Sequence, residues 1–277
     1  MQKGQQNKTI TLPSGRIIPA IGLGMWYLGE DAGAYFKETA LIRRALEIGY
    51  RVFDTAEMYG NGGAEEVLGE AVADCRKEVF LTSKVSPEFA TYEKIIEACD
   101  KSLERLQTTY LDMYLLHWGV SHNTRPEEVL EAFVDLKNAG KIRAFGVSHF
   151  DLSDLKEWLS FKEAAETEMN QAYFNLVHRQ MEKELLPYCR KKKIPLIAYA
   201  PMDVYPSAYE NGVLQRIAEK NDATPRQIVL AWLLAKDNVG VLVKSPDEES
   251  LNAFFQSQFI YLSREETDAL NAAFPLN

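Results

Sequence analysis

The stretch GYRVFDTAEMYGNGGAEEVLG (residues 49–69) joins an apolar run to a segment that favours a helix. The run is typical of a buried strand, and the segment after the glycines carries acids and aliphatic side chains at helical spacing. Asp54 ends the run, and Tyr59 lies in the short loop that follows it. This acid and phenol are either a surface aspartate and a packing tyrosine or members of a functional site. The rest of the sequence distinguishes the two interpretations.

The same order of strand and helix recurs along the chain. Eight short apolar runs alternate with amphipathic segments of 3.6-residue spacing. The runs are IIPAIGLG (17–24), YRVFDTA (50–56), VFLTSKV (79–85), LDMYLLHW (111–118), IRAFGVSHF (142–150), TEMNQAYF (167–174), PLIAYAPM (195–202) and VGVLVKS (239–245). Apolar strands that alternate with helices indicate a parallel sheet covered by helices.

Eight strand–helix units predict a (β/α)8 barrel, which we expect to form one domain over residues 1–277. An open doubly wound sheet is the alternative, but GLGMWYLGE (22–30) does not match the GxGxxG loop of such folds. The opening segment KTITLPSGRIIPA (8–20) has a Pro-Ser-Gly turn between two alternating runs and predicts an N-terminal β-hairpin. GVLQRIAEKN (212–221) and TPRQIVLAWLLAKD (224–237) predict extra helices near the C-terminus.

Composition excludes several classes of protein. The formal net charge of −9 argues against a general nucleic-acid binder and against binding to an anionic membrane. No apolar stretch approaches the roughly 20 residues that span a bilayer, and MQKGQQNKTI (1–10) lacks the apolar core of a secretory signal. Cys75, Cys99 and Cys189 are far apart and suggest neither a disulfide framework nor a metal cluster. We therefore expect a cytoplasmic protein.

Other strand ends carry polar partners for Asp54 and Tyr59. Lys84 lies at the end of the third run and His117 at the end of the fourth. The active sites of such barrels lie at the C-terminal ends of the strands, so we expect all four side chains on one face. A lysine that follows an apolar run is costly to bury without an acid, and Asp54 on the neighbouring strand can supply one.

These four groups suit one kind of chemistry. A free phenol has a pKa near 10, and a neighbouring ammonium lowers it. The carboxylate keeps that ammonium charged, and a neutral imidazole can hydrogen-bond and orient a carbonyl group. The set is suited to protonating an oxygen while a hydride arrives at carbon. No side chain donates hydride, so a cofactor is implied.

Five ordered motifs together resemble the aldo-keto reductase family, over nearly the whole chain. They are GLGMW (22–26), GYRVFDTAEMYGN (49–61), VFLTSKV (79–85), YLDMYLLHW (110–118) and GKIRAFGVSHF (140–150). The sequence is most similar to short prokaryotic members that reduce small aldehydes and dicarbonyls. The resemblance implies that Tyr59 is the general acid, that Lys84 lowers its pKa, that Asp54 pairs with Lys84, and that His117 orients the carbonyl.

The resemblance also implies a nicotinamide dinucleotide, NADPH in preference to NADH. The implied cofactor residues are Ser148, His149 and Gln171 for the carboxamide, Tyr199 for stacking on the nicotinamide ring, and Lys244 and Ser245 for the ribose 2′-phosphate. No metal is expected. The chain departs from the family pattern at several of these positions. His149 replaces the usual Asn, Ala200 replaces a Ser, Ser250 replaces an arginine, and Ala253 and Phe254 replace an acid and an amide that contact adenine.

Acids also surround the phosphate position. Asp247, Glu248 and Glu249 would repel a phosphate, or they are first-turn residues favoured by a helix dipole. NADPH remains the preferred cofactor, with weaker binding than is usual, and NADH remains possible.

The substrate should be a small carbonyl compound. We expect Trp26, Tyr27 and Trp118 to line an open, apolar mouth of the barrel. The resemblance implies that this chain has little of the long C-terminal loop that closes over large substrates in other members of the family. The protein should be a monomer or a weak homo-oligomer.

Three other functions are compatible with a barrel. One is a regulatory or scaffold subunit that binds nucleotide with little turnover. The second is an aldolase that uses Lys84 as a Schiff base, which would require a lysine free of Asp54. The third is metal-dependent hydrolysis, but His117, His122, His149 and His178 form neither HxH nor HExxH spacing.

Overall fold

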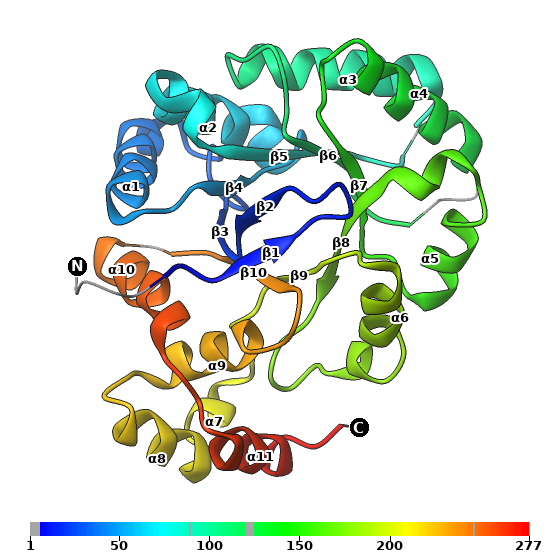
Figure 1. Cartoon of the computed structure of the whole chain (residues 1–277). Coiled ribbons are helices and arrows are strands. Elements are labelled where there is room, and N and C mark those ends of the chain that lie inside the picture. Colours follow the sequence, from blue (N-terminus) through cyan, green and yellow to red (C-terminus); the bar gives the residue numbers. More distant parts are fainter. Residues whose placement is uncertain (1–5, 89, 120–124, 246, 277) are drawn as a thin grey trace. The chain divides into compact units, whose positions relative to one another are not determined.

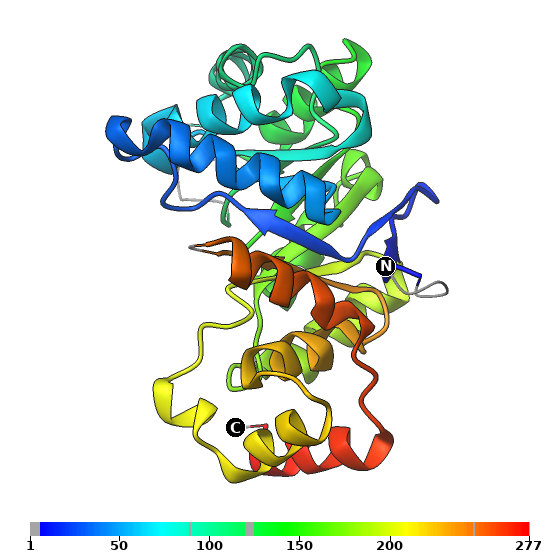
Figure 2. The same cartoon turned by 90° about the vertical axis from the view of Figure 1, so that its left-hand side faces the viewer.

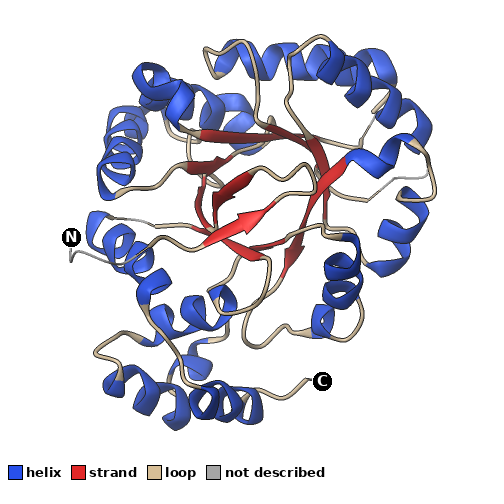
Figure 3. Cartoon of the chain, viewed as in Figure 1, coloured by secondary structure: helices blue, strands red, loops and turns tan. Residues whose placement is uncertain are grey.

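The computed structural model describes residues 6–88, 90–119, 125–245 and 247–276. In these residues, eight parallel strands form a closed barrel in the order β10-β3-β4-β5-β6-β7-β8-β9 (Figure 3). The strands are β3 (Ile21–Gly24), β4 (Val52–Asp54), β5 (Phe80–Val85), β6 (Met113–Leu116), β7 (Phe145–Ser148), β8 (Thr167–Tyr173), β9 (Leu196–Tyr199) and β10 (Val239–Val243). Each predicted apolar run contains one of them, so the (β/α)8 barrel is confirmed and the open sheet is excluded.

An antiparallel hairpin precedes the barrel, as predicted. Its strands β1 (Thr9–Thr11) and β2 (Ile17–Pro19) pair in the register Thr9 to Pro19. The first apolar run is therefore two strands, β2 and β3. They separate at Ala20, whose N–H donates to Lys8 while its carbonyl accepts from Val241, so the chain changes its pairing partner there.

Helices follow the strands in the expected alternation. The helices are α1 (Tyr35–Ile48), α2 (Gly63–Val72), α3 (Tyr92–Arg105), α4 (Pro126–Asn138), α5 (Leu152–Trp158), α6 (Leu185–Lys192), α7 (Pro206–Tyr209), α8 (Gly212–Lys220), α9 (Pro225–Leu234), α10 (Glu248–Gln256) and α11 (Arg264–Ala273). Asp151 and Thr224 form capping boxes at the starts of α5 and α9. Each side chain accepts a hydrogen bond from the backbone N–H three residues later, and the side chain of that later residue accepts one from the N–H of the cap.

The stretch QMEKELLPYCRKKK (180–193) is amphipathic, but only part of it forms an α-helix. A 3₁₀ turn occupies Gln180–Glu182, and α6 begins only at Leu185. Pro187 explains the break, because a proline lacks an N–H and its ring excludes the carbonyl four residues earlier, so it fits only the first turn of a helix.

The chain divides into two compact units. The central unit, residues 23–171, holds β4 to β7 and α1 to α5, and α1 contacts α2 while α3 contacts α4 (Figure 1). The terminal unit, which comprises the residues up to Gly22 and from Ala172 onward, holds the hairpin, β9, β10 and α6 to α11, and α8 contacts α9 and α11 (Figure 2). The single domain over residues 1–277 stays a prediction. Among the described helices, none is long and apolar enough to cross a membrane.

Candidate active site

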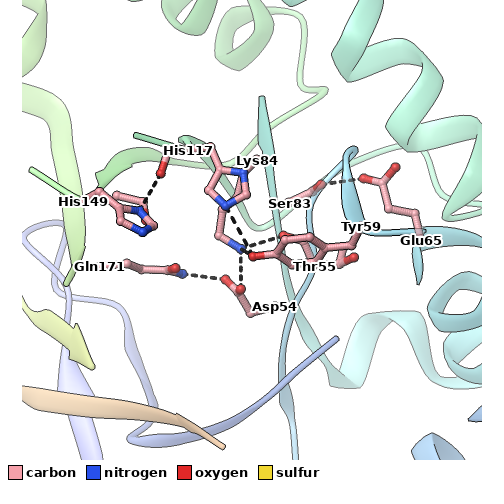
Figure 4. Close-up of polar contacts among 10 residues, drawn as sticks. Asp54, Thr55, Tyr59, Glu65, Ser83, Lys84, His117, His149 and Gln171 are labelled. Carbon is pink, nitrogen blue, oxygen red and sulfur yellow. Dashed lines mark hydrogen bonds and ion pairs between the residues drawn. The ribbon is translucent and has the colours of Figure 1, made fainter. Parts of the chain in front are cut away.

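A buried ion pair lies at the ends of β4 and β5. Asp54 ends β4, and Lys84 is the penultimate residue of β5. The Lys84 ammonium donates to Oδ1 of Asp54 and, across 2.7 Å, to the carbonyl oxygen of Thr55 (Figure 4). Lys84 is only 1% exposed. Burial of an unpaired ammonium would be strongly unfavourable, so these acceptors are required for the lysine to remain charged there.

Tyr59 brings its phenol to this pair from the turn that precedes α2. Its hydroxyl oxygen lies 3.5 Å from Nζ of Lys84 and 3.3 Å from Nε2 of His117. The four side chains predicted to act together therefore meet at one point of the central unit (Figure 4).

Two opposing effects set the pKa of Tyr59. Burial raises the pKa of the phenol, Lys84 lowers it, and the net result lies above the ordinary value. Burial also lowers the pKa of Lys84, but the carboxylate of Asp54 and then the phenol more than offset this, and the pKa is raised overall. Lys84 thus acts on Tyr59 in the predicted direction without outweighing the burial of the phenol.

His117 is a neutral imidazole in this environment. Burial, Lys84 and His149 together lower its pKa to about 2. Its Nδ1 is buried without a hydrogen-bond partner among the described residues, whereas Nε2 faces the hydroxyl of Tyr59. A neutral ring carries one proton, and we place it on Nε2 because only this nitrogen has a hydrogen-bond partner among the described residues. His117 can therefore donate a hydrogen bond to a carbonyl oxygen placed beside Tyr59.

Gln171 and His149 adjoin the four side chains. Nε2 of Gln171 donates to Oδ2 of Asp54 across 2.5 Å. Nδ1 of His149 lies 2.9 Å from the carbonyl oxygen of His117 and 3.0 Å from Oγ of Ser148. A carbonyl oxygen only accepts, so Nδ1 of His149 carries the proton.

This tautomer changes what His149 offers to a ligand. Partial desolvation lowers the pKa of its ring, against the opposing effect of the His117 carbonyl. The neutral ring therefore presents Nε2 as an acceptor, which suits the NH2 group of an amide and not its oxygen. His149 also has a positive φ of 59°, a backbone conformation that side-chain-bearing residues seldom adopt.

The three aromatic residues expected at the mouth lie in the central unit. Trp26 and Tyr27 follow β3, are 51% and 50% exposed, and stack with ring centroids 4.4 Å apart. Trp118 is half-buried, and its ring centroid lies 4.7 Å from that of His117. Their contact with a substrate stays a prediction.

A backbone contact joins the loop of Trp26 to the turn of Tyr59. A Cβ added to Gly29 would lie 2.1 Å from the carbonyl carbon of Gly63. A Cβ added to Gly60 would lie 2.7 Å from the backbone of Gly29. Only glycine permits this approach. The sequence shows these glycines, but their mutual contact requires the fold.

The remaining cofactor residues belong to the terminal unit, and their roles stay predictions. Tyr199 ends β9, half-buried, with its ring centroid 5.7 Å from that of Tyr173. Lys244 is exposed, and the hydroxyl of Ser245 donates to the carbonyl of Asp247 across 2.8 Å.

The acids beside Lys244 begin a helix. The side chain of Asp247 accepts from the N–H of Ser250 as the N-cap of α10, and Glu248 and Glu249 lie in its first turn. The helix-start interpretation of these acids is therefore confirmed.

Metal-dependent hydrolysis would need a cluster of metal-ligating side chains. Among the described residues, no group of three or more His, Cys, Asp or Glu side chains could hold a metal ion. His122 lies outside the described residues.

Comparison with known proteins decides the family. The model of the aldo/keto reductase family matches residues 20–204, which include all four side chains of the candidate site. The chain belongs to this family. The predicted resemblance is confirmed.

Two curated relatives of this aldo-keto reductase are similar along nearly its whole length. Methylglyoxal reductase YeaE of Escherichia coli K12 is 37% identical over 274 residues, which cover 98% of this chain and 96% of that relative. Glyoxal reductase of Bacillus subtilis is 35% identical over 267 residues, which cover 95% and 92%. The protein is thus an oxidoreductase of the carbonyl-reducing type, and the alternative of a regulatory or scaffold subunit with little turnover is set aside.

A solved structure shares the fold of this aldo-keto reductase. It is an aldo-keto reductase from Klebsiella pneumoniae in complex with NADPH, with a TM-score of 0.93 and 36% identity, covering 98% of this chain and 96% of that chain.

The aldolase alternative is also weakened, because it requires a lysine free of Asp54 and Lys84 is paired with that residue.

Proposed function

We propose that this protein reduces small aldehydes and dicarbonyls to alcohols with NADPH, and that Tyr59 donates the proton. One observation carries the proposal: the Tyr59 hydroxyl lies within reach of both an ammonium and a neutral imidazole. A carbonyl oxygen at this point would accept hydrogen bonds from Tyr59 and from Nε2 of His117.

The residues of the chain manage the proton. NADPH supplies the hydride when it is bound. As negative charge develops on the carbonyl oxygen, the proton moves to it from Tyr59, and Lys84 stabilises the phenolate that remains. Asp54 keeps Lys84 charged, and His117 holds the carbonyl oxygen in line because its ring is neutral and donates from Nε2.

The cofactor fits the acceptors of the site. The NH2 group of Gln171 donates to Asp54, so the Oε1 atom of Gln171 can accept a hydrogen bond from the nicotinamide carboxamide. Nε2 of His149 is an acceptor as well, and Ser148 supplies a hydroxyl beside it. Tyr199 would stack on the nicotinamide ring.

We propose NADPH as the preferred cofactor. Lys244 would meet the 2′-phosphate of its ribose, with Ser245 beside it, and the NADPH complex of the Klebsiella relative supports this choice. The departures at Ser250, Ala253 and Phe254 weaken the site for the adenosine end, so NADH remains the alternative.

The substrate class follows from the aromatic side chains and the relatives. Trp26, Tyr27 and Trp118 offer apolar faces with few polar groups, so the site should accept small carbonyl compounds broadly. Relatives named methylglyoxal and glyoxal reductases support this class.

Three further expectations belong to the proposal. The free thiols Cys75, Cys99 and Cys189 fit the cytoplasm, a reducing compartment. The protein should act as a monomer or weak homo-oligomer without nucleic-acid or membrane partners. Residues 1–277 should form a single domain, which the family match across both units supports.

A steady-state screen tests the proposal. Methylglyoxal, glyoxal, short aldehydes and a steroid ketone are each offered with NADPH and with NADH, and nucleotide oxidation is followed by absorbance. We expect the dicarbonyls and short aldehydes to be reduced with NADPH. The proposal fails if no carbonyl compound is turned over, and the substrate class is wrong if the steroid ketone has the highest kcat/KM.

A further inference from the structure

A second buried acid lies beside the catalytic pair. Glu65 is completely buried. Its Oε1 accepts from the hydroxyl of Ser83 across 2.5 Å, and its Oε2 accepts from Nε of Arg105 at 2.7 Å and Nη2 at 2.6 Å. The free energy needed to remove two charges from water can cancel the attraction between them, so a contribution to stability is not sufficient to explain the buried pair of Glu65 and Arg105.

Ser83 ties Glu65 to the strand of Lys84. The two residues are neighbours in β5, and successive side chains of a strand point to opposite faces. Lys84 reaches Asp54 within the site, whereas Ser83 reaches Glu65 on α2 (Figure 4). The hydrogen bond therefore attaches α2 to β5 at the residue next to the catalytic ammonium.

Glu65 and Arg105 also fix the turn that carries Tyr59. Glu65 is the third residue of α2, which begins directly after the turn Tyr59–Gly62. Arg105 packs against the end of that turn: a Cβ added to Gly62 would lie 2.7 Å from its Cδ. Gly62 has a φ of 95°, so a larger residue would be strained there as well as crowded.

The other end of the same segment is attached to β5 independently. The N–H of Thr55 donates to the carbonyl of Thr82 across 2.9 Å, and Oε1 of Glu57 accepts from the N–H of Ser86 across 2.8 Å. The segment before Tyr59 is thus held to β5 and to Ser86, the residue that follows it. Glu65 supplies the attachment on the helix side.

We propose that Glu65 is a positioning residue that, through Ser83 and Arg105, holds the hydroxyl of Tyr59 at its working distance from Lys84. The inference rests on the proposed function, in which Tyr59 donates the proton. The distance of 3.5 Å matters because the interaction between the ammonium and the phenol falls as the two separate. A displacement of about 1 Å can cost an enzyme on the order of 100-fold in rate.

The test uses two variants and a matched control. Glu65→Gln keeps the shape of the side chain and removes its charge, and Ser83→Ala cuts the link to β5 while leaving the ion pair. Asp112→Asn is the control, because Asp112 is also buried and bonded to an arginine, Arg76 at 2.9 Å, and to β5 through the N–H of Leu81 at 3.1 Å.

We expect kcat with methylglyoxal and NADPH to fall roughly 10- to 100-fold in Glu65→Gln and less in Ser83→Ala. KM for NADPH should change little in both. Asp112→Asn should lose stability to urea and keep its kcat. In a Tyr59→Phe background, Glu65→Gln should cause almost no further loss, because a residue that acts through Tyr59 has nothing left to position.

Three outcomes would overturn the inference. They are a parent-like kcat in Glu65→Gln or in Ser83→Ala, an equal loss of kcat in Asp112→Asn, and a full additional loss in the double variant. If Glu65→Gln does not fold, Ser83→Ala decides, since it removes only one hydroxyl. Absence of turnover in the parent protein would reject the proposed function itself, whereas an active parent with an impaired Tyr59→Phe and an unaffected Glu65→Gln rejects only the role of Glu65.

Discussion

The side chain of Gln171 donates a hydrogen bond to Oδ2 of Asp54 across 2.5 Å, and Lys84 donates to the other oxygen of the same carboxylate. Because Nζ of Lys84 also faces the hydroxyl of Tyr59, a continuous chain of four side chains runs from β8 to the phenol. Gln171 was expected only to bind the cofactor. Its contact with Asp54 gives it a second role, because it fixes the carboxylate that pairs with Lys84.

Gln171→Leu should therefore lower kcat even when NADPH is saturating. The substitution leaves Oδ2 of Asp54 without its donor, and loss of a hydrogen bond to a buried charged group costs about 1.5–3 kcal/mol. We expect a fall in kcat of roughly tenfold or more, measured by steady-state kinetics. Asn170→Ala is the control, because Asn170 precedes Gln171 in β8 and donates to the carbonyl of Phe150. An unchanged kcat in Gln171→Leu would restrict this residue to cofactor binding.

Tyr59→Phe removes the proton donor and keeps the ring. We expect kcat to fall at least ~10²-fold, the low end for a general acid, with NADPH binding retained in a fluorescence titration. Tyr114→Phe is a matched control, because Tyr114 is fully buried and its hydroxyl has no hydrogen-bond partner among the described residues. Removal of that hydroxyl should leave kcat unchanged. Similar kinetics for the two variants would reject Tyr59 as the acid.

The neutral state of His117 makes stability depend on pH. Burial, followed by Lys84 and His149, lowers its pKa from 6.5 to about 2. Below pH 6.5 the unfolded chain takes up a proton that the folded protein does not. The contribution of the neutral ring to the free energy of unfolding is thus complete above that pH and is lost on acidification, by at most about 1.4 kcal/mol per pH unit.

Urea unfolding between about pH 7 and about pH 5 checks this dependence. The slope of unfolding free energy against pH should be shallower in His117→Gln than in the parent. Part of the slope should remain, because the pKa of His149 is lowered too. Identical slopes for His117→Gln and the parent would show that His117 is not held neutral by the fold.

Cofactor preference should depend mainly on Lys244. A charge-assisted hydrogen bond to phosphate contributes on the order of 1.5–3 kcal/mol, so Lys244→Ala should raise Kd for NADPH roughly tenfold or more and leave NADH almost unchanged. Ser250→Arg should tighten NADPH selectively, since an arginine restores planar, bidentate donors. Asp247 should still cap α10 in that variant, because the N–H of residue 250 that donates to its side chain belongs to the backbone. Equal losses for both nucleotides in Lys244→Ala would remove the main support for NADPH.

The sequence predicts the barrel well because its signals are local. Every apolar run that was assigned to the barrel contains a barrel strand, and Asp151 and Thr224 are residue types that favour the N-cap positions they occupy. The meeting of Asp54, Lys84 and His117 follows from the same rule, since strand ends in a parallel barrel share one face. Tyr59 could be placed near them only because its turn is short.

Relations between distant side chains could not be predicted in this way. The tautomer of His149 depends on a carbonyl 32 residues away, and the bond of Gln171 crosses 117 residues. Glu65 looks like an ordinary helix acid in the sequence, and only the fold buries it between Ser83 and Arg105. The net rise in the pKa of Tyr59 likewise depends on burial, which the sequence does not give.

The contact between Gly29 and Gly63 has a consequence for engineering this enzyme. The loop that presents Trp26 and Tyr27 rests directly on the backbone that leads from Tyr59 into α2, with no side chain between them to absorb a movement. Insertions or bulky replacements that reshape the aromatic loop will therefore be transmitted to the proton donor. Libraries that aim to broaden the substrate range should vary residues 25–33 and 58–63 jointly. If only one segment is varied, a change that alters substrate specificity will also displace Tyr59 and lower kcat.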